Sequence, residues 1–83
     1  MDDTKIVNVE EFKHEYVSGV VKEVASILED RGYNPVNQIV GYLISGEPGY
    51  ISNHKEARNR ITEFDRTKIL EILLEEFLNK WDI

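Results

Sequence analysis

The chain has 83 residues, a formal net charge of −6 and no cysteine, so it forms one small domain without disulfides or zinc–thiolate sites. No apolar run reaches the ~20 residues of a membrane-spanning helix. The acidic start, MDDTKIVNVEE, does not resemble a secretory signal. Acidity also argues against bulk nucleic-acid binding, which needs a positive surface. We therefore expect a cytoplasmic protein with protein partners and no membrane insertion.

Residues 1–11 are predicted to form a flexible N-terminal tail, and residues 12–83 a helical dimerisation and interaction domain. Acidic residues flank one short apolar stretch of the tail, and Thr4 is its only hydroxyl residue. An acidic terminus is usually a solvated end without a specific role. A kinase could also modify an accessible hydroxyl, and phosphate would add about −1.5 to −2 charges. The tail residues alone leave both interpretations open.

A first long helix is predicted over residues 11–31. Its apolar residues follow the i, i+3, i+4, i+7 spacing that places them on one stripe. They are Val17, Val20, Val21, Val24, Ile27 and Leu28. Gly32 supplies the left-handed position that ends such a helix.

Backbone-shaping residues are concentrated in segment 32–50, GYNPVNQIVGYLISGEPGY. Asn34 can cap a second helix that starts at Pro35. Gly41 inside this helix costs about 1 kcal/mol relative to alanine, which indicates close approach of another helix. Gly46 ends the helix, and Pro48 prevents its extension. The residues of this structural motif are Gly32, Tyr33, Asn34, Pro35, Gln38, Gly41, Tyr42, Gly46 and Pro48.

Two further helices are predicted after this segment. The first covers residues 54–61, with Asn53 as its cap and Glu56 as the capping-box partner. The second covers residues 66–80 and follows Asp65 as its cap. Its apolar residues are Ile69, Leu70, Ile72, Leu73, Leu74, Phe77, Leu78 and Trp81. They occupy nearly the whole circumference, which is typical of a helix buried on several sides. We predict an all-α domain of about four helices that forms a symmetric homodimer through the last helix.

No pattern indicates an enzyme, a metal site or a cofactor. His14 and His54 lie in different elements, whereas a metal site needs several converging ligands. Ser45 lacks the Gly-x-Ser-x-Gly context of a nucleophile, so we expect its hydroxyl to cap backbone groups at a helix end. No Gly-Lys-Ser/Thr follows the glycines, which excludes a P-loop.

A local basic cluster stands out in the acidic chain. Its members are His54, Lys55, Arg58, Arg60, Arg66 and Lys68. Surface ion pairs worth ~0–1 kcal/mol each would account for it. Alternatively, His54, Arg58, Arg60 and Arg66 bind an anionic partner, since the arginine fork matches carboxylate and phosphate. A nucleic-acid-associated protein that uses Arg58 and Arg66 is a weaker alternative, as is a purely structural dimer with an unmodified tail.

The run GYNPVNQIVGYLISGEPGYI, followed by His54-Lys55-Glu56-Ala57-Arg58, resembles the IreB/ReoM family of small regulatory phosphoproteins. The resemblance extends from the Asp-Asp-Thr of the tail to the last helix. It implies a cytosolic, helical homodimer from low-GC Gram-positive bacteria. It also implies that a transmembrane Ser/Thr kinase sensing cell-wall state phosphorylates the tail threonine, here Thr4, and that a phosphatase reverses this.

The resemblance further implies an influence on peptidoglycan synthesis and cell-wall antibiotic resistance. In one branch of the family, the unmodified protein promotes Clp-protease degradation of the enzyme that commits UDP-N-acetylglucosamine to peptidoglycan. Two positions depart from the family pattern, because Asn53 and Thr62 stand where basic residues are expected. These departures predict weaker or different partner contacts, whereas Arg58 and Arg66 remain.

Overall fold

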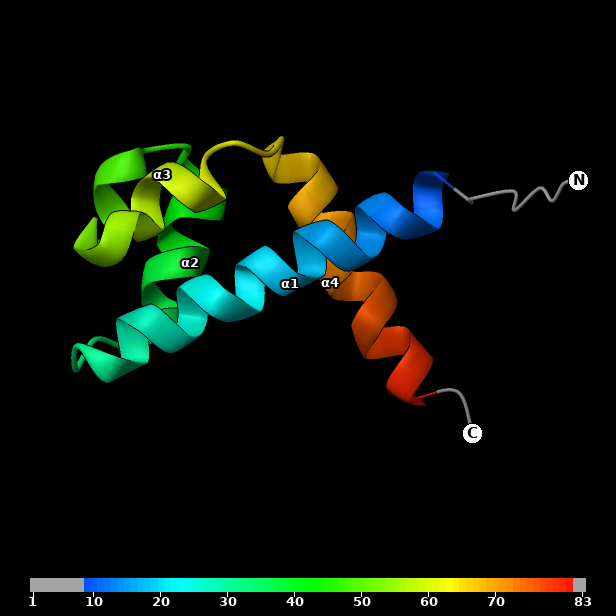
Figure 1. Cartoon of the computed structure of the whole chain (residues 1–83), viewed down its shortest axis with the longest axis horizontal. Helices are drawn as coiled ribbons and strands as arrows, with labels where there is room; N and C mark the ends of the chain where they lie inside the picture. Colours follow the sequence, from blue (N-terminus) through cyan, green and yellow to red (C-terminus); the bar gives the residue numbers. More distant parts are fainter. Residues whose placement is uncertain (1–8, 82–83) are drawn as a thin grey trace, which may run out of the picture.

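The computed structural model describes the backbone of residues 9–81 and the side chains of residues 9–79. Its longest element is α1 (Val9–Asp30), on which the other helices pack (Figure 1). The predicted stripe is confirmed for five of its six residues, because Val17, Val20, Val21, Val24 and Leu28 are buried, whereas Ile27 is partly buried. The helix begins two residues earlier than predicted. Residues 9–11, assigned to the tail from the sequence, are therefore helical.

The end of α1 is a Schellman motif built on Gly32. This glycine has a φ of 91°, in the left-handed region. Its N–H donates to the Glu29 carbonyl at 2.9 Å, and the Tyr33 N–H donates to the Leu28 carbonyl at 3.0 Å. These two bonds satisfy carbonyls that the helix itself leaves without donors. The predicted stop at Gly32 is confirmed.

Helix α2 (Pro35–Ser45) has both predicted caps. The Asn34 side chain accepts a hydrogen bond of 3.0 Å from the Asn37 N–H, and Pro35 occupies the first turn. At the other end, Gly46 has a φ of 76° and donates its N–H to the Tyr42 carbonyl at 2.7 Å. Local signals alone therefore fix both ends of this helix.

The close approach predicted at Gly41 comes from a side chain and not from another helix. The 3₁₀ helix η1 (Pro48–Tyr50) brings the Tyr50 ring onto this position. A Cβ built on Gly41 would lie 2.5 Å from the Tyr50 Cδ1 atom, which is closer than real contacts allow. Gly41 thus lets the chain turn back and place an aromatic ring on α2.

The predicted helix over residues 54–61 is interrupted. It consists of a 3₁₀ helix, η2 (His54–Glu56), followed by α3 (Ala57–Ile61). Lys55 and Glu56 have φ values of 50° and 63°, so Glu56 cannot complete the predicted capping box. The Asn53 side chain instead accepts a 3.4 Å hydrogen bond from the Asn59 N–H.

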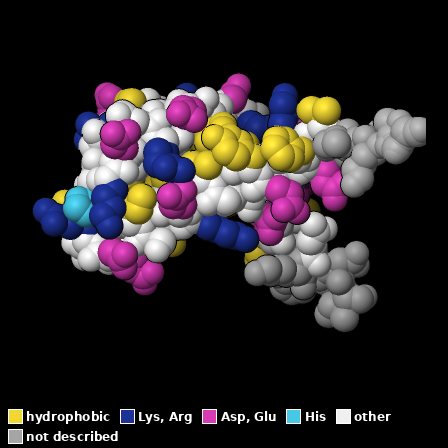
Figure 2. All heavy atoms as spheres, viewed as in Figure 1, with side chains coloured by type: hydrophobic (Ala, Val, Ile, Leu, Met, Phe, Trp, Pro, Cys, Tyr) yellow, Lys and Arg dark blue, Asp and Glu magenta, His cyan; other side chains and the backbone are white. Residues whose placement is uncertain are grey.

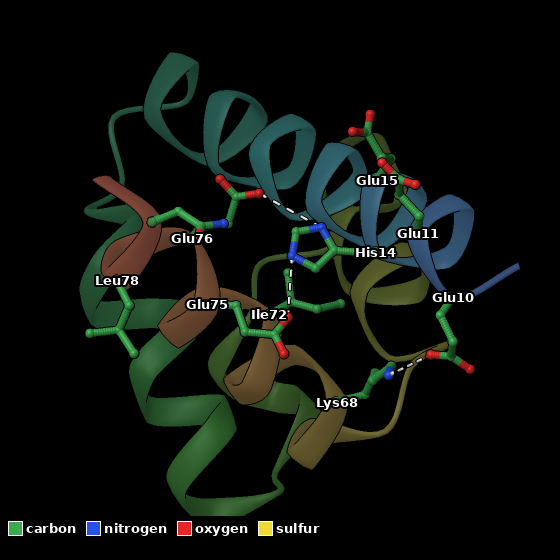
Figure 3. Close-up of a pocket in the computed structure, with 10 residues that line it drawn as sticks. Glu10, Glu11, His14, Glu15, Lys68, Ile72, Glu75, Glu76 and Leu78 are labelled. Carbon is green, nitrogen blue, oxygen red and sulfur yellow. Dashed lines mark ion pairs between the residues drawn. The ribbon is translucent and has the colours of Figure 1, made fainter. Parts of the chain in front are cut away.

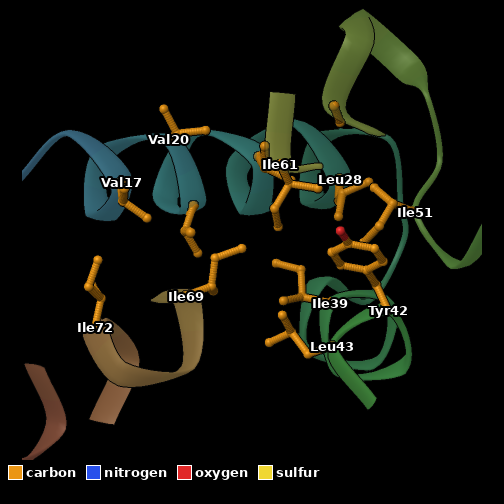
Figure 4. Packing of buried hydrophobic residues seen from close by; sticks show 13 residues of the cluster. Val17, Val20, Leu28, Ile39, Tyr42, Leu43, Ile51, Ile61, Ile69 and Ile72 are labelled. Atoms are coloured by element: carbon orange, nitrogen blue, oxygen red, sulfur yellow. The ribbon is translucent and has the colours of Figure 1, made fainter. Parts of the chain in front are cut away.

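Helix α4 (Arg66–Trp81) begins after Asp65, whose side chain accepts a 2.9 Å hydrogen bond from the Thr67 N–H, as predicted. Ile69 and Ile72 are buried against α1 (Figure 4). Most of its other apolar side chains are exposed, among them Leu70, Leu73, Leu74, Phe77 and Leu78. One side of α4 is therefore buried in this chain. The side chain of Trp81 lies outside the described residues.

The core lies along one face of α1. Helices α2 and α3 pack on its C-terminal half, and α4 crosses its N-terminal half (Figure 1). In the core, Leu28 lies near Ile51 and Tyr42, whereas Val17 faces Ile72 (Figure 4). Over residues 9–81 the architecture is all-α, with four α-helices and two 3₁₀ helices. No helix in this range is long and apolar enough to cross a membrane.

Candidate functional site

Four of the predicted basic residues form what we call the cationic end: His54, Lys55, Arg58 and Arg60. They come from η2 and α3, which are adjacent in the chain and contact α1. Figure 2 shows Lys and Arg side chains beside a histidine at one end of the molecule. The left-handed conformations of Lys55 and Glu56 set how η2 leads into α3.

Arg58 has a structural contact of its own. Its Nε donates a 2.9 Å hydrogen bond to the carbonyl of Ile51, whose side chain is fully buried. Charge-assisted bonds of this kind are about twice as strong as neutral ones. The contact joins α3 to the residue that follows η1. The terminal nitrogens of the guanidinium carry further N–H donors.

Arg60 pairs with α1. Its Nη2 lies 2.6 Å from the Glu23 Oε1, and both side chains are about half exposed. The Arg60 Nε atom is buried without a hydrogen-bond partner. An exposed pair of this kind contributes only ~0–1 kcal/mol. Arg60 can therefore exchange Glu23 for another carboxylate at little cost in stability.

Arg66 belongs to α4 and binds the end of α2. Its Nη1 donates a 3.0 Å hydrogen bond to the Leu43 carbonyl. The same guanidinium lies against Gly46, where a Cβ would be 2.8 Å from Cζ. A cation is favourable here because the last carbonyls of a helix carry partial negative charge. Arg66 therefore occupies a different position from the arginines of α3.

Residues 44–50 lie between the Leu43 carbonyl, bound by Arg66, and the Ile51 carbonyl, bound by Arg58. They comprise the end of α2, Gly46-Glu47 and η1, and we refer to them as loop 44–50. The Ser45 hydroxyl donates to the Gly41 carbonyl at 2.7 Å and accepts from the Glu47 N–H at 2.9 Å, so its predicted capping role is confirmed. Ser52 lies just beyond the loop, and its N–H donates a 3.0 Å hydrogen bond to the Gln38 side chain of α2. The role of Gln38 depends on a residue 14 positions away, which no local pattern reveals.

A groove between α1 and α4 was not predicted (Figure 3). His14 lies between two carboxylates of α4, with Nε2 3.4 Å from Glu75 and Nδ1 3.7 Å from Glu76. Lys68 lies 3.6 Å from Glu10 of α1. These partners are more than 50 residues apart in sequence, so only the fold brings them together. Within the described residues, no three His, Asp or Glu side chains are arranged to hold a metal ion.

The two departures from the family pattern have local structural roles. Asn53 accepts a hydrogen bond from α3, as described above. The Thr62 hydroxyl donates to the Arg58 carbonyl at 2.7 Å, at the end of α3. Both side chains thus contact the short helix that carries Arg58. Thr4, the predicted phosphorylation site, lies outside the described residues.

A comparison with family models gives a match that covers almost the whole chain. Residues 2–79 match the model described as IreB regulatory phosphoprotein. The matched range includes Thr4, segment 32–50, the cationic end and most of α4. The chain therefore belongs to the IreB family of regulatory phosphoproteins.

Proposed function

We propose that this protein is a phosphorylation-controlled adaptor that regulates peptidoglycan synthesis and antibiotic tolerance. The observation that carries the proposal is the match to a regulatory phosphoprotein family over a range that includes the tail. In its unmodified form the protein binds an enzyme of peptidoglycan-precursor synthesis and promotes its degradation by a Clp protease. A membrane Ser/Thr kinase ends this binding, and a phosphatase restores it.

Thr4 is the acceptor in this proposal. It is the only Ser or Thr that precedes α1. Several hydroxyls of the helical region are poor acceptors by comparison. Ser18 is buried, and the hydroxyls of Ser45 and Thr62 donate to helix carbonyls. The position of Thr4 in the Asp-Asp-Thr start of the family match therefore supports it as the acceptor.

The cationic end, together with Arg66, is the proposed partner contact. Its charges suit an acidic protein surface, since arginine binds carboxylates through paired N–H donors. We favour protein over nucleic acid as the partner. The whole chain carries a charge of −6, whereas nucleic acid binds an extended positive surface. An acidic patch on a partner protein can be bound by the local basic cluster alone.

Self-association completes the proposal. Exposed leucines cover the outer side of α4, and a second exposed apolar row follows α2. The α2 residues are Val36, Val40 and Ile44, spaced four apart and 67%, 44% and 79% exposed. Contiguous apolar surface on a small protein marks an interaction site. We propose that a second copy of the chain covers the α4 surface in a symmetric homodimer.

The test is phosphorylation by a cell-wall-sensing Ser/Thr kinase, followed by intact-mass measurement. We expect a single phosphate on the wild-type chain, mapped to Thr4, and none on Thr4→Val. Thr4→Ser is the matched control and should still accept phosphate. Phosphate at another residue, or none, would refute the assignment of Thr4. It would favour a structural dimer with an unmodified tail.

A further inference from the structure

Loop 44–50 presents apolar side chains outward between two buried anchors. Ile44 is 79% exposed and Tyr50 53% exposed. Leu43 and Ile51, which flank the loop, are 7% and 0% exposed. The segment consists of the end of α2, the left-handed Gly46 with Glu47, and the 3₁₀ helix η1, so its own hydrogen bonds shape only short turns of the chain. Whatever fixes this loop therefore fixes the surface that it presents.

Two guanidinium groups bind the carbonyls at the two ends of the loop. Arg66 donates to Leu43 at 3.0 Å, and Arg58 donates to Ile51 at 2.9 Å. The two arginines belong to different helices, α4 and α3, that follow the loop in the chain. The loop is thus held by other helices at both ends, in addition to its hydrogen bonds to α2 and those within η1.

Both contacts depend on the shape of arginine as well as its charge. Arg58 uses Nε, within the side chain, and lysine has no donor at that position. Arg66 lays its guanidinium on Gly46, where even a methyl group would be 2.8 Å from Cζ. Lysine would keep the positive charge but could not reproduce either arrangement. A role that depended on positive charge alone would require neither the Nε donor of Arg58 nor the packing of the Arg66 guanidinium on Gly46.

We propose that Arg58 and Arg66 are positioning residues that fix loop 44–50 in the conformation that contacts a protein partner. Their substitution weakens partner binding by releasing the loop, even where the positive charge is retained. This inference rests on the proposed adaptor function for the identity of the partner. Its structural part, the dependence of the loop on the two guanidinium groups, can be tested in the isolated chain.

The first test compares Arg58→Lys and Arg66→Lys with the wild type by NMR. The Tyr50 ring lies on Gly41, so the ring current should displace the Gly41 Hα resonance. In both variants we expect this displacement to shrink. Amide exchange at Gly46, Tyr50 and Ile51 should rise about tenfold, as for the loss of one hydrogen bond. Arg31→Lys, at the exposed end of α1, is the matched control and should leave both signals unchanged.

The second test measures binding of the same variants to the peptidoglycan-precursor enzyme. We expect Arg58→Lys to bind more weakly than the wild type although it keeps the positive charge, whereas Arg31→Lys binds like the wild type. Unchanged Gly41 and amide signals in both lysine variants would overturn the inference, provided that α1 resonances show an intact fold. Wild-type binding by Arg58→Lys would overturn it too. If the wild-type chain itself fails to bind this enzyme, the proposed function fails, and the NMR comparison still decides the role of the arginines.

Discussion

At the scale of single residues, Gly46 combines two requirements that alanine cannot meet. Its φ of 76° disfavours a side chain, and a Cβ would collide with the Arg66 guanidinium. Gly46→Ala should lower the free energy of unfolding by about 1–3 kcal/mol. Gly19→Ala is the control, because this helical glycine has nothing within 4 Å of a built Cβ. It should stabilise the chain by about 0.5–1 kcal/mol. Urea unfolding of both variants measures the contrast, and equal stability would contradict it.

The residues that could be predicted from the sequence are those whose role is local. Asn34 caps the helix that starts one residue later, and Gly32 ends the helix just before it. Arg66 was predicted to bind a partner. Its hydrogen bond to the Leu43 carbonyl at the end of α2 could not be predicted, because the two residues are 23 positions apart in the sequence. The left-handed Lys55 and Glu56 were missed because side chains other than glycine seldom take this conformation.

At the scale of elements, α4 has two apolar sides with different roles. Ile69 is fully buried against α1, whereas Leu74 is 58% exposed. Ile69→Ala should therefore cost about 2–4 kcal/mol of unfolding free energy. Leu74→Ala should change it by less than about 0.5 kcal/mol in the dilute monomer. The same Leu74→Ala change should weaken self-association, measured by sedimentation equilibrium. A monomeric wild-type chain at tens of micromolar would contradict the proposed dimer.

The sequence predicted the extent of α4 but not which of its sides packs internally. When apolar residues occupy nearly the whole circumference of a helix, the pattern does not show which side packs against the rest of the chain. Only the packing of Ile69 and Ile72 on α1 identifies the internal side. By contrast, the single stripe of α1 pointed to one buried face, and Val17 to Leu28 form that face.

At the scale of the whole molecule, the tail precedes the N-terminal end of α1, whereas α3, which carries Arg58, packs on the C-terminal half of that helix (Figure 1). Arg58 binds Ile51, which lies near Leu28 in the core. Leu28 follows Val9 by 19 residues, about 28 Å along the helix. The five residue steps from Val9 back to Thr4 span at most about 18 Å. With residues 4–9 fully extended along α1, the Thr4 backbone would still end about 10 Å short of Leu28, so we predict no lasting contact between a Thr4 phosphate and Arg58 of the same chain.

A spin label tests this separation directly, since the chain has no cysteine and Thr4→Cys gives a unique attachment site. In the first sample, the chain that carries both the label and nitrogen-15 is diluted into excess unlabelled wild type. We expect strong relaxation enhancement in the first turns of α1 and much weaker enhancement at Arg58. Enhancement at Arg58 as strong as in the first turns of α1 would place the tail beside Arg58 of its own chain and contradict this prediction. In a second sample, the spin-labelled chain without nitrogen-15 is mixed with the nitrogen-15 wild-type chain. Strong enhancement at Arg58 in this sample would place the tail of one chain beside Arg58 of the other.

The central claim is that one phosphate on Thr4 switches the adaptor off. The most direct measurement compares the unmodified and the Thr4-phosphorylated chain for binding to the peptidoglycan-precursor enzyme by calorimetry. Because phosphate adds about −1.5 to −2 charges to a tail that already carries Asp2 and Asp3, we predict at least about tenfold weaker binding after phosphorylation. Thr4→Val should bind like the unmodified wild type before and after kinase treatment. Equal affinity of the two wild-type forms would contradict the account.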